Sequence, residues 1–324
     1  MTLIVAKHIR GVTVVVTDTK LSPHSGASWA WSDQANKIIC LSNDWAIGYA
    51  GNTSVVDAAL LRLPKRPRFD DLKTILLDVH RESLPLDPAD FLLFSIRTQA
   101  IHRISGGQIK KQEGGTAWIG ETKGYSIFQS QYHARQATEA IAKSNGDISF
   151  EPGTRGIQPQ IVEAVVDRLH THASNSLRGA IEDQATPSVG GVPITFIIAK
   201  GSQTFWPMVS GVFASPEPII EPSRDRDLLF GEARTGDFNY EVLVSEDPTK
   251  NVVAVYYRNA RTLLVFARWE AGIPFGKVFT DIEYSDAASF VSEKCETTMW
   301  RVRIERTSSS SYAINADGPG IWRN

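Results

Sequence analysis

Thr2 directly follows Met1, and a threonine at this position can act as a nucleophile once the methionine is removed. A threonine hydroxyl is unreactive until a base takes its proton. An N-terminal threonine carries such a base, its own α-amine, whose ordinary pKa is about 7.7 to 8.0. Threonine is small enough for methionine aminopeptidase to remove the residue before it. The chemistry open to Thr2 is amide hydrolysis through an ester intermediate.

Three more positions stand out after Thr2. Asp18 ends the β-branched run 12–17, Lys37 begins the next apolar run, and Gly51 closes the run 45–50. Each has a plain structural explanation when taken singly: a turn aspartate, a solvated lysine, and a glycine needed for a positive φ. Their shared order is more informative than any of them alone.

The residues around these positions resemble the start of a proteasome β-subunit, and more closely the bacterial HslV peptidases. The resemblance rests on TLIVA at 2–6, Gly11, TD at 17–18, NKI at 36–38 and AIGYAG at 46–51. In that family a nucleophilic Thr is followed by a turn Gly, an Asp, a Lys and a Gly in this order. The stretch between Asp18 and Lys37 is a few residues longer here, which indicates a remodelled loop.

The resemblance implies a role for each position. Lys37 would be a buried cation that disfavours protonation of the Thr2 α-amine, and Asp18 would pair with and orient Lys37. Gly51 would offer its backbone N–H to the oxyanion of the tetrahedral intermediate. Tyr49, two residues earlier, would line the specificity pocket.

A weaker match lies farther along the chain. Proteasome subunits carry an Asp and then Ser-Gly-Gly before a strand, where the Asp and Ser support the nucleophile. The corresponding residues here are Asp183 and Ser188, although extra residues separate them and Val189 splits Ser188 from the glycine pair. The alternative is an ordinary loop that enters a strand.

One departure from the family pattern concerns a serine whose hydroxyl lies beside the nucleophile. The stretch IGETKGY at 119–125 places Glu121 at that position. A carboxylate there would bind the α-ammonium of Thr2 and raise its pKa, which would slow the reaction near neutral pH. Alternatively, Thr122 supplies the hydroxyl.

Hydrophobic periodicity predicts the elements that must position these residues. A hairpin is expected from 2–6 and 12–17, and a second one from 37–41 and 45–49. Helices are expected at 55–63, 70–82, 126–143 and 159–174, with strands at 91–96, 100–104, 117–119 and 192–199. Proline and charge from about 212 indicate a linker, followed by strands at 240–244, 251–257, 262–269 and 299–304.

Together with the resemblance, these elements predict an α+β fold. Residues 1–212 are expected to form a four-layer αββα N-terminal-nucleophile (Ntn) hydrolase sandwich, with two antiparallel sheets between helices. Residues 213–324 are expected to form a small β-rich C-terminal module that resembles no family.

Composition limits the other functions. The chain has 324 residues, 42% hydrophobic and 22% charged, with a formal net charge of -2. This balance offers no field for nucleic acid or an anionic membrane, and no apolar run is long enough to span a bilayer. Two distant cysteines, Cys40 and Cys295, form no disulfide framework, so a reducing cytoplasm is expected. No signal peptide is recognised.

No metal or other cofactor is expected. His170 and His172 lie two positions apart on a predicted helix and therefore do not share a face. A phosphate-binding loop of the Gly-x-x-x-x-Gly-Lys-Ser/Thr type does not occur in the sequence, so any use of ATP would belong to another chain.

The leading prediction is a threonine-type peptidase that acts on polypeptide or peptide substrates. The family implies a homo-oligomeric ring and, by analogy, an ATP-dependent unfoldase as partner. Two alternatives stay open: a small-molecule Ntn amidase, whose pocket the loop with Trp29 and Trp31 would close, and a catalytically silent ring-forming or binding protein, for which Glu121 argues.

Overall fold

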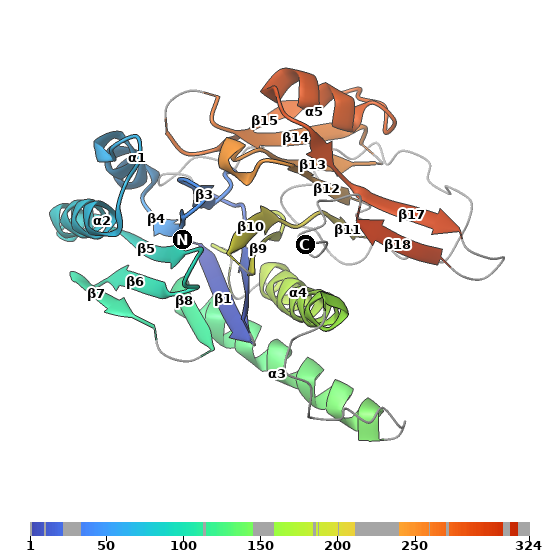
Figure 1. Cartoon of the computed structure of the whole chain (residues 1–324), viewed down its shortest axis with the longest axis horizontal. Coiled ribbons are helices and arrows are strands. Elements are labelled where there is room, and N and C mark those ends of the chain that lie inside the picture. Colours follow the sequence, from blue (N-terminus) through green and yellow to red (C-terminus); the bar gives the residue numbers. More distant parts are fainter. Residues whose placement is uncertain are drawn as a thin grey trace.

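The protein is described by a computed structural model of the whole chain (Figure 1). The described residues are 2–9, 11–21, 34–112, 115–144, 159–183, 186, 188–199, 201–210, 240–258, 260–269, 272–306 and 312–316. Side-chain surroundings are described for these residues except 137–144, 159–168, 209–210, 302–306 and 312–316.

The N-terminus belongs to a five-stranded antiparallel sheet with the order β10-β9-β2-β1-β8. Its strands are β1 Leu3–Ile9, β2 Val12–Thr17, β8 Thr116–Gly120, β9 Ile194–Ala199 and β10 Ser202–Phe205. β-Branched residues favour the extended backbone of β1 and β2. Gly11, with φ 77°, provides the tight turn between them. The predicted N-terminal hairpin is confirmed.

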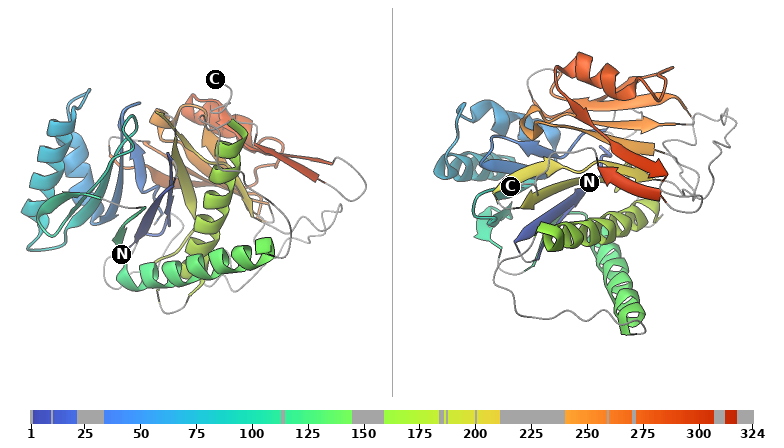
Figure 2. Two further views of the ribbon diagram at one scale, coloured as in Figure 1. Left: turned by 60° about the horizontal axis from the view of Figure 1, so that its bottom comes forward. Right: turned by 45° about the vertical axis from the view of Figure 1, so that its right-hand side comes forward.

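Two long helices, α3 Thr122–Ser144 and α4 Pro159–Glu182, follow β8 and precede β9. α4 lies against this sheet, whereas α3 extends past its edge (Figure 2). Alternate residues of β1 and β2 pack on the apolar faces of the helices, as the two periods require. This apolar cluster includes Leu3, Val5, Val12, Val14, Val16, Phe128, Tyr132, Leu169, Ala173 and Leu177.

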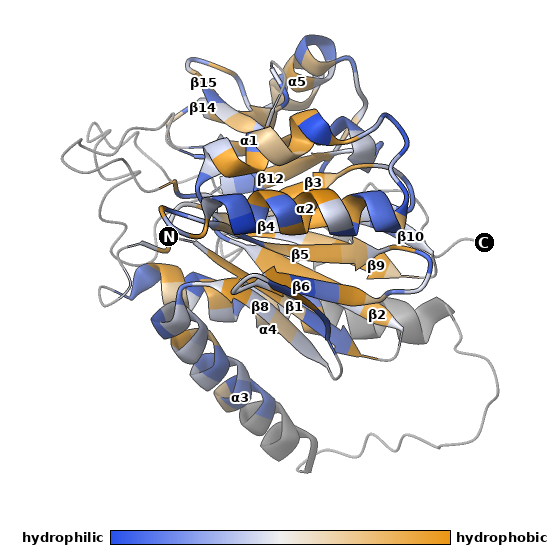
Figure 3. Ribbon diagram, turned by 90° about the vertical axis from the view of Figure 1, so that its left-hand side faces the viewer, coloured by the Kyte–Doolittle hydropathy of each residue, from blue (hydrophilic) through white to orange (hydrophobic). Residues whose placement is uncertain are grey.

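A second five-stranded sheet has the order β3-β4-β5-β6-β7. Its strands are β3 Ile38–Cys40, β4 Trp45–Gly51, β5 Ala89–Ser95, β6 Ile101–Ser105 and β7 Gln108–Lys111. The helices α1 Thr53–Arg62 and α2 Phe69–Ser83 cover one face of it. Asn52 caps α1 by accepting a hydrogen bond from Ser54 N–H. α2 carries hydrophilic residues on its outward side (Figure 3).

The remaining faces of these two sheets share one apolar cluster. Ile4 and Ile119 of the first sheet pack in it with Ile38 and Phe94 of the second. A Cβ atom on Gly48 would lie 3.2 Å from Ile4 Cδ1, so β1 and β4 approach closely. The start of β1, which directly follows Thr2, therefore lies between the two sheets.

The C-terminal part adds a third antiparallel sheet with the order β11-β12-β13-β14-β15 and β16 beside β12. These strands are β11 Met208–Ser210, β12 Tyr240–Ser245, β13 Val253–Tyr257, β14 Thr262–Ala267, β15 Phe275–Phe279 and β16 Met299–Trp300. The helix α5 Ala287–Cys295 packs on one face. A short helix lies at Pro248–Lys250, and β17 Val302–Arg306 pairs with β18 Tyr312–Ala316.

The chain is therefore a mixed α/β protein with several antiparallel sheets, as expected. β11 precedes residue 212 but pairs with β12, and the expected linker lies in 211–239, outside the described residues. α5 and β15 were not predicted. In the described part of the chain, no helix is both long and apolar enough to cross a bilayer.

Candidate active site

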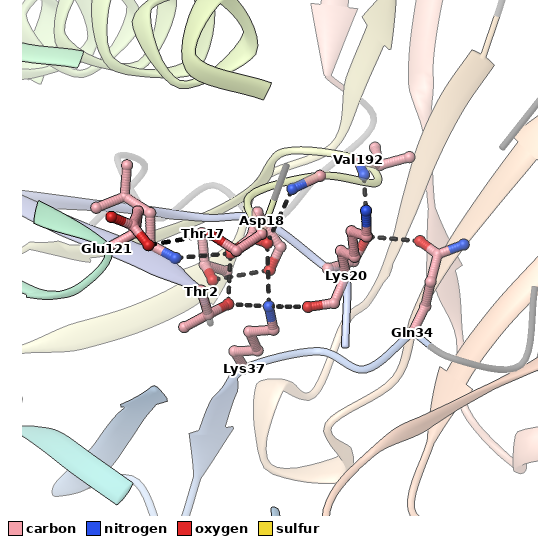
Figure 4. Close-up of polar contacts among 12 residues, drawn as sticks. Thr2, Thr17, Asp18, Lys20, Gln34, Lys37, Glu121 and Val192 are labelled. Atoms are coloured by element: carbon pink, nitrogen blue, oxygen red, sulfur yellow. Dashed lines mark hydrogen bonds and ion pairs between the residues drawn. The ribbon is translucent and has the colours of Figure 1, made fainter. Parts of the chain in front are cut away.

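Thr2 directly precedes β1 and is 4% exposed. Its Oγ1 donates a hydrogen bond to Asp18 Oδ1 at 2.5 Å and accepts one from Lys37 Nζ. The hydroxyl thus lies between a carboxylate and an amine (Figure 4). The fold brings together three of the residues that the sequence singled out.

The register of the N-terminal hairpin positions Asp18. Ile4 pairs with Thr17, so the next step along the hairpin places Asp18 beside Leu3. Asp18 Oδ1 also accepts from Leu3 N–H at 2.9 Å, and Oδ2 accepts from Gly190 N–H at 3.2 Å. Both oxygens of this fully buried carboxylate are therefore hydrogen-bonded.

Lys37, which directly precedes β3, is 1% exposed and directs its amine at three acceptors. These are Thr2 Oγ1, Asp18 Oδ2 at 3.1 Å and the carbonyl oxygen of Lys20. Burial lowers the pKa of Lys37 because desolvation penalises the ammonium, while the charge of Asp18 acts in the opposite direction. A cation at this place would stabilise negative charge on Thr2 Oγ1.

A second set of buried contacts fixes the loop after β2. Thr19 Oγ1 donates to Gln34 Oε1 at 2.6 Å and accepts from Val192 N–H at 2.9 Å. Gly191 has φ 79°, and a Cβ atom there would lie 2.2 Å from Thr19 Oγ1. These contacts link the loop after β2 to Gln34, in the segment before Lys37, and to Val192, in the segment before β9; Gln34 and Val192 are labelled in Figure 4. Thr19 and Gln34 could not be singled out from the sequence, because neither residue type is unusual in a loop.

The end of β8 holds the main chain of Thr2. Glu121 N–H donates to the Thr2 carbonyl oxygen at 2.7 Å. Gly120 has φ 101°, and a Cβ atom there would lie 1.8 Å from the same oxygen. The Glu121 carboxylate accepts hydrogen bonds from Ser188 Oγ at 3.1 Å and Lys123 N–H at 3.3 Å. Glu121 therefore lies next to Thr2, and Ser188 is bound to Glu121.

Asp183 and Ser188 have different surroundings. Thr186 donates through its N–H and its Oγ1 to the Asp183 carbonyl oxygen at 3.0 and 3.1 Å, which forms the turn after α4. Ser188 reaches the Glu121 carboxylate. Of the two, Ser188 is connected to Thr2 by described contacts, through Glu121.

Gly51 ends β4 immediately before α1. It has φ 113°, and a Cβ atom there would lie 2.2 Å from the Pro88 carbonyl oxygen. Its neighbour Ala50 has its Cβ 3.4 Å from the place where a Gly120 Cβ would be, beside the Thr2 carbonyl. Gly51 therefore directly follows Ala50, which lies beside the Thr2 carbonyl group. The positive φ of Gly51 and its close contact with Pro88 require glycine whether or not its N–H binds an oxyanion.

Tyr49 is 1% exposed and belongs to the apolar cluster beneath α1 and α2. Its hydroxyl donates to the Asn36 carbonyl oxygen at 3.4 Å. Burial raises the pKa of Tyr49 well above its ordinary value, and the carboxylates of Asp57 and Asp18 raise it further. The side chain lies in the core and lines no open surface.

Two other features lie away from Thr2. A surface hollow of about 410 Å³ at the far end of β4 is lined by Asp44, Trp45, Phe69, Ser95, Arg97, Thr98 and His102. His170 and His172 lie on α4, where burial lowers the pKa of His170 to about 4.

Among the described residues, no group of three or more His, Cys, Asp or Glu side chains could hold a metal ion. The loop with Trp29 and Trp31 lies outside the described residues.

Comparisons with known proteins find similarity among solved structures but none among curated sequences. No protein-family model matches the chain, and no curated protein matches its sequence. Eukaryotic HslV from Trypanosoma brucei matches with a TM-score of 0.39 and 16% identity, over 61% of this chain and 99% of that chain. Function is therefore inferred from the site and from the motif residues.

Proposed function

We propose that this chain is a threonine-type Ntn hydrolase that cleaves amide bonds in peptide substrates with Thr2 after Met1 is removed. One observation carries the proposal: Thr2 Oγ1 contacts both Lys37 Nζ and Asp18 Oδ1. All three side chains are almost fully buried, so the charges of Lys37 and Asp18 act on the hydroxyl with little screening by solvent.

In the proposed reaction, Thr2 Oγ1 attacks the substrate carbonyl carbon while its proton passes to the α-amine of the same residue. Lys37 stabilises the charge on Oγ1 and disfavours protonation of the free amine, and Asp18 holds Lys37 in place. Gly51 N–H is the proposed donor to the oxyanion. Collapse breaks the C–N bond, the α-ammonium protonates the leaving amine, and water then hydrolyses the ester on Thr2.

For the fold, we propose that 1–212 forms a four-layer αββα Ntn-hydrolase sandwich and that 213–324 forms a β-rich module. The proposal is supported by α3 and α4 on one sheet, α1 and α2 on the other, and the apolar cluster that the sheets share. A homo-oligomeric ring and an ATP-dependent unfoldase partner stay proposals that rest on the sequence resemblance. A cytoplasmic location stays a proposal that rests on the two distant cysteines. The native mass of the purified protein tests the ring.

A small-molecule amidase is the second candidate, and one observation favours it. Ile273, from the C-terminal part, is 2% exposed and packs in the same apolar cluster as Tyr49. The side chain that was expected to line the specificity pocket is thus covered by the chain itself. A compact substrate needs less of this pocket than an extended peptide.

The test is the intact mass of the purified protein before and after incubation with an N-terminal-threonine reagent such as a β-lactone. Wild type should lack Met1 and gain one adduct, whereas Thr2→Ala should gain none. Thr280→Ala, at an exposed threonine, is the matched control and should react like wild type. A chain that lacks Met1 and gains no adduct would contradict the proposal, and a retained Met1 would favour the silent protein. Hydrolysis of peptide libraries and of small amides then separates peptidase from amidase.

A further inference from the structure

Residues 272–276 of the C-terminal part contact the chain immediately before Lys37. Asn36 N–H donates to the Pro274 carbonyl oxygen at 3.0 Å, and Gly276 N–H donates to the Gln34 carbonyl oxygen at 2.9 Å. Ala35 forms an antiparallel bridge with Phe275 between these bonds. A short piece of β-pairing therefore ends one residue before Lys37.

Asp57 on α1 fixes the beginning of this segment. Its Oδ1 accepts from Ile273 N–H at 2.8 Å. Gly272 has φ 125°, and a Cβ atom there would lie 2.6 Å from the same oxygen. Ile273 packs with Tyr49 and Val56 in the cluster beneath α1. The beginning of the segment is thus held by the hydrogen bond to Asp57 and by the buried side chain of Ile273.

The segment completes an edge that would otherwise be open. β3 is the terminal strand of its sheet. On the side that faces β4, the chain through 34–37 has backbone partners, since Ala35 N–H donates to the Thr19 carbonyl oxygen at 2.9 Å and Gln34 forms an antiparallel bridge with Lys20. On that side Tyr49 N–H donates to the Lys37 carbonyl oxygen at 3.1 Å. On the opposite side 272–276 supplies hydrogen-bonding groups that the edge would otherwise leave to solvent. The two sides together fix the direction from which Lys37 reaches Thr2.

We propose that 272–276 is a positioning element of the active site, with Asp57 and Ile273 as positioning residues that act on Thr2 through Lys37. The C-terminal module is then part of the catalytic unit. The catalytic consequence rests on the proposed function, whereas the coupling between Asp57 and the 34–37 segment does not.

This positioning role predicts a change in how the labelling of Thr2 depends on pH. If the segment detaches, the amine of Lys37 is held less closely to the α-amine of Thr2. A more distant cation repels the added proton more weakly, so the α-amine is protonated more easily and its pKa rises. The pH profile of Thr2 labelling should then shift to higher pH. A purely structural loss would lower the amount of reactive protein without shifting the profile.

Asp57→Ala and Asp57→Asn form the decisive pair. Both remove the charge, but only asparagine keeps a side-chain oxygen that can accept the Ile273 N–H bond. Gly272→Ala disrupts the same hydrogen bond in a second way, since the added Cβ atom would collide with Asp57 Oδ1. Hydrogen exchange on the full-length variants reports on 34–40, with 169–183 of α4 as internal reference. β-Lactone labelling at several pH values reports on Thr2.

Asp57→Ala and Gly272→Ala should each raise exchange at 34–40 by roughly ten-fold and slow labelling by a similar factor, with the pH profile shifted upward. Asp57→Asn should behave like wild type in both assays. Unchanged exchange at 34–40 in both disrupting variants would overturn the inference, whether or not the wild type is labelled. Raised exchange with unchanged labelling would also overturn it. A wild type that takes no label would instead contradict the proposed function, and the exchange result would still decide the coupling.

Discussion

At the scale of single residues, Lys37 and Asp18 form an ion pair with side chains 1% and 0% exposed. Replacing Lys37 by methionine would leave the Asp18 carboxylate buried without its countercharge. We expect Lys37→Met to lower the free energy of unfolding by about 3 kcal/mol, the range for breaking a buried pair. Urea unfolding measures this change. The double variant Lys37→Met with Asp18→Asn should recover part of the loss, and a loss equal to the sum of the two single effects would contradict the pairing.

The lowered pKa of Lys37 makes a prediction for alkaline pH. Between the folded pKa and the ordinary value of about 10.4, the unfolded chain binds more protons than the folded one, so stability rises with pH. The slope from this residue is at most about 1.4 kcal/mol per pH unit. Lys37→Met should therefore gain less stability than wild type as the pH rises toward the ordinary lysine pKa of about 10.4. Lys7 and Lys20, whose pKa values burial also lowers, keep part of the slope in the variant. Equal slopes in the two proteins would refute the prediction.

Gly120 tests how closely the main chain of Thr2 is held. Gly120→Ala would place a Cβ atom 1.8 Å from the Thr2 carbonyl oxygen at a positive φ of 101°. A displacement of about 1 Å at the nucleophile should slow β-lactone labelling by roughly 100-fold. Gly106→Ala is the matched control, since its φ is also positive but nothing lies within 4 Å of the added atom. Its labelling should equal that of wild type; slowing in both variants alike would indicate backbone strain as the cause.

The order of Thr2, Asp18, Lys37 and Gly51 was recognised in the sequence as a family pattern, and the register of the N-terminal hairpin explains why Asp18 lies beside the start of β1. Tyr49 could be assigned to a strand but not to a face, because the sequence does not reveal what covers it. Other residues of the site depend on contacts between distant segments, and no local pattern carries such contacts. These residues are Thr19, Gln34 and Gly120, together with the proposed positioning residues Asp57 and Ile273.

At the scale of elements, the side chain of Asn251 forms hydrogen bonds with the backbone of Cys40 in the edge strand β3. The amide accepts from Cys40 N–H at 2.6 Å and donates to the Cys40 carbonyl oxygen at 3.0 Å. Asn251 has φ 55°. We expect Asn251→Ala to lower stability by about 2 kcal/mol through lost hydrogen bonds and backbone strain, measured by urea unfolding.

Two variants control for that change. Asn251→Gly removes the hydrogen bonds without the strain and should retain part of the stability. Asn43→Ala, at an exposed asparagine, should stay within about 0.5 kcal/mol of wild type. If Asn251→Ala behaves like Asn43→Ala, the side chain of Asn251 does not stabilise this edge.

The sequence predicted strands and helices best where an apolar period was uninterrupted. The strands expected at 240–244, 251–257 and 262–269 correspond to β12, β13 and β14. β15 was missed because its sequence, FGKVF, mixes glycine and lysine with apolar residues. α5 is a nine-residue helix in which serines interrupt a short apolar pattern, so its helical periodicity is weak. The edge position of β15 and the cover that α5 gives the sheet arise only from tertiary packing.

At the scale of the whole molecule, the predicted boundary near residue 212 marks a change in composition, and residues on both sides of it pack in one shared core. One face of the third sheet packs in the same cluster as the two N-terminal sheets, through Tyr240, Val242, Val244, Val253, Val255, Tyr257, Leu264 and Phe266. Its other face packs on α5. Composition shows where along the chain the sequence becomes rich in proline and charge, but it does not show which sheet faces pack against each other.

This shared core predicts that residues 1–212 do not fold stably alone. Each large apolar side chain contributes about 1.5–3 kcal/mol when fully buried, and domains have total stabilities of only about 5–15 kcal/mol. Losing the C-terminal sheet removes more apolar contacts than that margin allows. A chain ending at residue 212 should be insoluble or lack a cooperative thermal transition, as followed by circular dichroism. A chain ending at residue 306, which loses β18 alone among the described elements, should unfold cooperatively like the full chain. A soluble 1–212 chain with the full-length transition would mean that the proposed hydrolase unit carries its own core, and that the C-terminal sheet docks on a finished domain.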